Sequence, residues 1–104
     1  MRQGLINSVA AITVNEQVES MRKFPLFSST HEGYAVILEE VEEAREEVEY
    51  IVEDMNIMWL YIKANDTKNA MYYVEKLKRR AISAACEMVQ VAAMAQKFIE
   101  SVTE

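Results

Sequence analysis

The chain has 104 residues and a net charge of −6, with one cysteine, two glycines and one proline. Its length suits a single domain, residues 1–104, whose modest core would gain from burying further surface in an oligomer. The lone Cys86 excludes a disulfide framework and a metal–thiolate site, and the abundance of helix formers predicts an all-α fold.

The first predicted helix covers about residues 3–21 and carries an irregular apolar stripe. Asn7 and Thr13 interrupt the apolar residues here and no cleavage site follows, so we expect no signal peptide. Pro25 then forbids helix and favours an extended Phe24. Ser29, with Glu32 three residues later, has the pattern of a capping box and predicts the start of a second helix.

The second predicted helix covers about residues 30–64 and contains most of the acidic charge. Between residues 32 and 54 there are ten acids against Arg45 alone, a local charge of −9, so the rest of the chain carries +3. This pattern argues against nucleic-acid binding and favours cations or a basic partner. A solvated helix face is the alternative, but lysine or arginine partners four residues away are nearly absent.

An apolar stripe accompanies these acids along the same helix and is predicted to pack in the core or in an interface. Its members are Ile37, Val41, Ala44, Val48, Ile51, Met55, Trp59 and Ile62. The apolar run at 57–62 is a third of the length of a membrane span, and Lys63 ends it. We therefore expect a soluble, cytoplasmic protein with no membrane partner.

A break at residues 65–68, with Asn65 as a left-handed cap, precedes a third helix over about residues 67–102. The apolar run at 81–95 lies in this helix, and we expect its Cys86 to be a buried, inert thiol. Two long helices joined by so short a turn pack antiparallel, so residue numbers that sum to about 131 lie at the same height.

This register places two pairs of polar residues opposite each other. Glu40 and Glu43 lie on one edge of the second helix, flanked by Glu39, and Glu87 and Gln90 share a face of the third. Three carboxylates that converge on one point repel one another, and Mg²⁺ would neutralise them. We therefore predict that Glu87 is a metal ligand; a salt bridge with a nearby lysine or arginine is the alternative.

Three other polar residues have weaker claims to a functional role. Lys76 and Arg80 lie on the same stripe of the third helix as Glu87 and could bind a polyphosphate held by the metal. Pairing with acids on the opposing helix is the alternative for both. For His31, beside a helix start, capping or surface exposure is favoured over catalysis.

The residues EEVEE at 39–43 have the form EExxE, and the helix that bears Glu87 supplies the start of an ExxD-like element. Together the two segments resemble the MazG-like all-α nucleotide pyrophosphohydrolases. The stretches HEGYAVILEEVEEAREEV and CEMVQVAAMAQKF resemble small phage or prophage members of that group. The likeness covers about two-fifths of the chain.

The resemblance implies an antiparallel helical bundle completed by oligomerisation, as a dimer or tetramer. It implies cleavage of a nucleoside triphosphate to the monophosphate and pyrophosphate with Mg²⁺, or Mn²⁺. It assigns the metal to Glu40, Glu43 and Glu87, with Glu39 supporting or positioning the attacking water.

Gln90 stands where the family has Asp, and the stretch between Glu43 and Glu87 is longer than usual. The carboxamide can coordinate through its oxygen but carries no charge. The alternative is therefore a MazG-like scaffold that has lost its chemistry and acts as a binding or oligomeric module. A ferritin-like di-iron bundle would need Glu-x-x-His pairs, and the only histidine is not in one.

Overall fold

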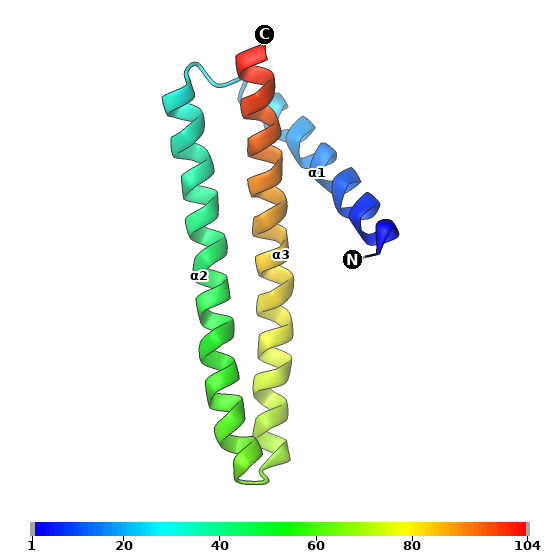
Figure 1. Cartoon of the computed structure of the whole chain (residues 1–104), viewed down its shortest axis with the longest axis vertical. Coiled ribbons are helices and arrows are strands. Elements are labelled where there is room, and N and C mark those ends of the chain that lie inside the picture. Colours follow the sequence, from blue (N-terminus) through cyan, green and yellow to red (C-terminus); the bar gives the residue numbers. More distant parts are fainter. Residues whose placement is uncertain (1, 104) are drawn as a thin grey trace. The chain divides into compact units, whose positions relative to one another are not determined.

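In a computed structural model that describes residues 2–103, the protein consists of three helices, with no strand among those residues (Figure 1). Helix α1 is Gln3–Lys23, α2 is Thr30–Lys63 and α3 is Thr67–Thr103. The all-α prediction is confirmed, and the helix ends lie within two residues of those expected. No helix in the described part of the chain combines the length and apolarity needed to cross a membrane.

Packing divides the chain into two compact units where the sequence suggested one domain. The terminal unit comprises the residues up to Val41 and those from Glu87 onward, and the turn unit comprises Glu42–Cys86. Helices α2 and α3 each contribute one segment to the terminal unit and another to the turn unit.

In the terminal unit, the connection between α1 and α2 follows the signals read from the sequence. Phe24 is extended, and its N–H donates to Ser20 O at 2.9 Å to close α1. Ser29 Oγ accepts the N–H of Glu32 at 3.1 Å, which is half of the predicted capping box. The Glu32 carboxylate bonds Ser28 instead of Ser29, accepting its hydroxyl at 2.8 Å and its N–H at 3.3 Å.

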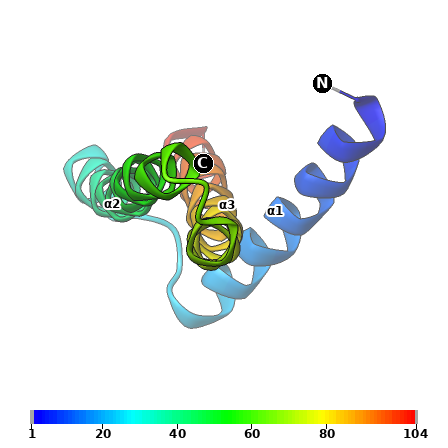
Figure 2. The same cartoon turned by 90° about the horizontal axis from the view of Figure 1, so that it is seen from below.

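Helix α1 lies beside α3 only near its C-terminal end, and its N-terminal end points away from α3 (Figure 2). It buries none of its residues, and polar contacts join it to α3. These contacts are Glu16–Gln90, Gln17–Glu100 and Ser20–Lys97. The apolar side chains of its first half, from Leu5 to Val14, are largely exposed.

In the turn unit, the segment that joins α2 to α3 is closed by hydrogen bonds at both helix ends. Asn65 has φ 59°, so the predicted left-handed cap is confirmed. Its N–H donates to Ile62 O at 3.0 Å and that of Asp66 to Tyr61 O at 2.9 Å, the two bonds of a Schellman motif. Asp66 Oδ1 then accepts the N–H of Asn69 at 3.2 Å and caps α3.

The hairpin register is confirmed within the turn unit. The rings of Tyr61 and Tyr73 stack with centroids 5.8 Å apart, and Arg80 Nε donates to Asp54 Oδ2 at 2.7 Å. The two residues of each pair lie at the same distance from the α2–α3 connection along their helices, to within about one helical turn, as the register predicts.

The apolar stripe predicted along α2 does not form the buried face. Ala44 is buried and Ile37 and Ile51 are half-buried. The other five members are 41–55% exposed: Val41, Val48, Met55, Trp59 and Ile62. The less exposed face of α2 is rotated away from this stripe. It includes three acids spaced seven residues apart, Glu40, Glu47 and Asp54. Hydrophobic periodicity alone cannot show such a rotation, because it assigns acids to the solvent face.

The prediction for Cys86 is also wrong, because this thiol is exposed. Within the run 81–95, Ile82 and Met88 are more than half exposed, and Ala84, Ala93 and Met94 are buried. Packing covers one side of α3 here, and Cys86 lies on the other.

We predict that the buried carboxylate of Asp54 stabilises the turn unit. It is 3% exposed, bonds Arg80, and has Lys76 Nζ at 3.9 Å. Removing it leaves a partly buried guanidinium without its acceptor, so Asp54→Ala should lower the free energy of unfolding by about 1–3 kcal/mol.

The matched control is Glu53→Ala, the exposed acid next to it, which should change that free energy by less than about 0.5 kcal/mol. Urea titrations at one fixed protein concentration measure both. Equal losses in the two variants would contradict a specific role for Asp54.

Candidate metal centre

The structure brings Glu40 of α2 and Glu87 of α3 together within the terminal unit. Each offers one carboxylate oxygen, and these atoms lie within 4.8 Å of each other. Glu43 follows Glu40 by one turn of α2 and belongs to the turn unit. Glu40 and Glu87 are half-buried and Glu43 is exposed. Two of the three carboxylates predicted from the register, Glu40 and Glu87, thus lie close together, and the place of Glu43 beside them stays a prediction.

Like charges at this distance make a cation favourable. Two carboxylates this close repel each other. A divalent cation reverses the sign of the interaction and accepts oxygen ligands from both helices. The donor set consists only of carboxylate oxygens, which suits the hard ions Mg²⁺ and Mn²⁺ better than softer metals.

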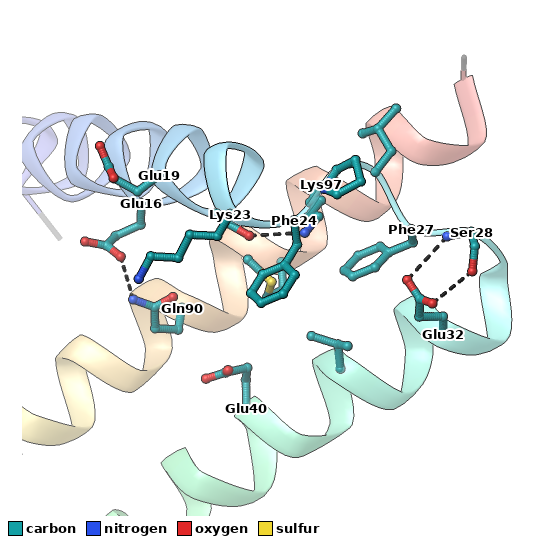
Figure 3. A pocket seen from close by; sticks show the side chains of 15 residues that line it. Glu16, Glu19, Lys23, Phe24, Phe27, Ser28, Glu32, Glu40, Gln90 and Lys97 are labelled. Carbon is teal, nitrogen blue, oxygen red and sulfur yellow. Dashed lines mark hydrogen bonds between the residues drawn. The ribbon is translucent and has the colours of Figure 1, made fainter.

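Gln90, the predicted fourth ligand, is engaged through its amide nitrogen. Its Nε2 donates to Glu16 Oε2 at 2.7 Å and ties α3 to α1 (Figure 3). The amide oxygen is the atom that would coordinate a metal, so its role as a ligand stays a prediction. Glu16, which orients this amide, was not singled out in the sequence.

Glu39, predicted to support the attacking water, is exposed on α2. His31 is also exposed, at the start of α2. The role of Glu39 stays a prediction.

Lys76 and Arg80 both pair with the buried Asp54 inside the turn unit. The Arg80 guanidinium also lies 4.6 Å from the centre of the Tyr50 ring. Pairing with an acid on the opposing helix, the alternative to phosphate binding, is therefore what the structure contains. A phosphate role for either residue remains a prediction.

A cavity of about 810 Å³ opens in the terminal unit where the α1–α2 connection meets α3 (Figure 3). Glu40 of the carboxylate group and Gln90 both line it. The other lining residues are Glu16, Glu19, Ser20, Lys23, Phe24, Pro25, Leu26, Phe27, Ser28, Glu32, Val36, Met94 and Lys97.

Lys97 is the unusual group in this wall because it is only 3% exposed. Its ammonium donates to Ser20 Oγ at 3.2 Å and lies 4.8 Å from the centre of the Phe27 ring and 6.0 Å from that of Phe24. Burial lowers the pKa of Lys97 below its usual 10.5, and the charge of Glu32 opposes that shift in part.

The wall that holds Phe27 is fixed from two sides. The Phe27 N–H donates to Ser101 Oγ at 2.9 Å, which anchors the α1–α2 connection to α3. The rings of Phe27 and Phe98 occupy the space beside Gly33, where a Cβ would lie 3.1 Å from Phe27 and closer still to Phe98. A glycine is required here by the close approach of these rings.

Sequence reasoning missed Lys97, Phe24 and Phe27 as residues of a site. A signal was present for Lys97, since it follows Ala93 and Met94 by four and three residues and so continues their buried face. A lysine at a core position of a helix is unusual. No comparable signal marks the two phenylalanines.

Comparison of the chain with models of known protein families, with curated proteins and with solved structures finds no match.

We predict that Lys97→Met stabilises the protein at neutral pH. The folded pKa is lowered, so the folded state disfavours the ammonium, and this cost is fully present below the folded pKa. The advantage of the variant over the wild type should shrink as the pH rises through the lowered pKa of Lys97.

Urea midpoints measured from pH 7 to pH 11 at one protein concentration test this. Lys23→Met, which removes an exposed lysine of the same cavity, is the control and should change the free energy of unfolding at pH 7 by less than about 0.5 kcal/mol. The prediction would be contradicted if Lys97→Met were less stable than the wild type by the same amount at every pH in this range.

Proposed function

We propose that the chain is a Mg²⁺-dependent nucleoside triphosphate pyrophosphohydrolase of the MazG-like type. The observation that carries the proposal is the pair of carboxylate oxygens from Glu40 and Glu87, which lie within 4.8 Å of each other in the terminal unit. It is supported by the EExxE pattern that contains Glu40 and Glu43 and by the cavity that Glu40 also lines.

The chemistry follows from the charges. A cation on Glu40, Glu43 and Glu87 would bind the phosphates of the substrate and lower the pKa of a coordinated water. Attack of a water on the α-phosphorus would break the bond from that phosphorus to the bridging oxygen and would give a nucleoside monophosphate, pyrophosphate and a proton. Glu39, next to Glu40, would support the water.

Purified protein should therefore release pyrophosphate from at least one of the common NTPs and dNTPs with Mg²⁺ or Mn²⁺. Glu87→Gln keeps the shape of the side chain but removes a ligand charge, and should lower the rate by about 10²–10³-fold. Glu75→Gln, an equal change at an exposed position of α3, should leave the rate unchanged. Absence of turnover with every nucleotide would contradict the proposal.

The contact of Gln90 with Glu16 favours a second candidate, a scaffold that has lost its chemistry and acts as a binding or oligomeric module. Gln90→Asp alone would place a carboxylate against Glu16, so the test combines it with Glu16→Gln. Activity that appears only in this double variant would favour the degenerate scaffold. Activity in the native protein that Glu87→Gln abolishes would exclude it.

The proposal includes a homo-oligomer, supported by the surface of the chain. Exposed apolar residues recur every seven positions on α2: Tyr34, Val41, Val48, Met55 and Ile62.

We predict that size-exclusion chromatography with light scattering gives a molar mass of at least twice 12.0 kDa, because a second copy covers this stripe. Val48→Lys with Met55→Lys should shift it towards the monomer, while Glu53→Lys, on the same helix, should not. A wild-type monomer at all micromolar concentrations would contradict the prediction.

A further inference from the structure

We propose that the cavity of the terminal unit holds the base of a nucleotide, and that Lys97 selects bases that present a carbonyl oxygen. The inference rests on the proposed function for the class of ligand. It adds the place of the base and the group that discriminates among bases.

The cavity has the size and position for this role. About 810 Å³ lies within the range of small-molecule sites. Glu40 belongs both to the carboxylate group and to the cavity lining, so a ligand bound at the carboxylates extends into the cavity. Glu87 and Lys97 are ten residues apart on α3, about 15 Å along the axis. A ligand that engages both is elongated and carries polar groups at its two ends, as a nucleotide does.

The rings of Phe24 and Phe27 supply a surface for a flat ligand. Phe24 is 68% exposed although it lines a cavity, so its ring offers a face on which a base can stack. Phe27 is held by its hydrogen bond to Ser101 and by packing beside Gly33. The platform is therefore in place before a ligand arrives, which limits the entropy lost on binding.

Lys97 sets the selectivity because an ammonium donates hydrogen bonds and accepts none. Uracil, thymine and guanine present a carbonyl oxygen where adenine presents an amino group, which is itself a donor. A buried donor rejects a ligand that lacks the matching acceptor far more strongly than an exposed one does. Lys97 is 3% exposed, and the neighbouring rings and Ser20 hold its ammonium in place.

The test measures binding of UMP, GMP and AMP to the full chain without metal, by calorimetry or by NMR titration. The wild type should bind UMP and GMP at least ten-fold more tightly than AMP, and Lys97→Met should abolish this ratio. Lys23→Met changes the charge of the same cavity equally and should preserve the ratio. Phe24→Ala, at an exposed ring, should weaken binding of all three nucleotides by a similar factor.

Equal affinities for the three nucleotides, or no binding at millimolar concentration, would overturn the inference. The inference would also be overturned if Lys97→Met weakened binding of inorganic pyrophosphate as much as binding of UMP, since Lys97 would then contact phosphate. Selective binding without turnover of any triphosphate would uphold the inference while the enzymatic proposal fails. The two failures are therefore distinguishable.

Discussion

The charge of the acids on the less exposed face of α2 is the constraint that decides the contacts of this helix. Glu40, Glu47 and Asp54 recur on this face every seven residues, where a helical hairpin normally carries apolar side chains. In the turn unit, Asp54 is neutralised by Arg80 and Lys76. In the terminal unit, Glu40 lies close to another carboxylate, Glu87, and a bound cation would make that contact favourable.

Small buried side chains make these polar contacts possible. The buried apolar residues among those described are four alanines and one methionine: Ala44, Ala70, Ala84, Ala93 and Met94. Alanines let helices approach closely but bury little apolar area, so the hydrophobic contribution within one chain is small. Further burial in a homo-oligomer is part of our proposal, and the exposed stripe on α2 is the surface we expect it to cover.

Much of the fold could be predicted because it follows from local signals. Pro25, Ser29 and Asn65 each act through the backbone within a few residues, and the short turn then fixes which residues of α2 and α3 are opposite each other. This register was sufficient to predict that Glu40 and Glu87 lie close together. It could not show the rotation of α2 or the exposure of Cys86, because both depend on how many neighbours cover each helix. The sites of Asp54 and Lys97 were missed for a related reason, since charged residues are assigned to solvent by default.

The most direct test of the account is to locate a bound cation on the chain. In NMR spectra of ¹⁵N-labelled protein, substoichiometric Mn²⁺ should broaden the amide signals around residues 40–43 and around residue 87 together, and Glu87→Gln should remove this selectivity. The exposed acids Glu42, Glu46 and Glu49 provide the comparison on the same helix. Broadening centred on those three residues, with the signals around residue 87 unaffected, would contradict the account.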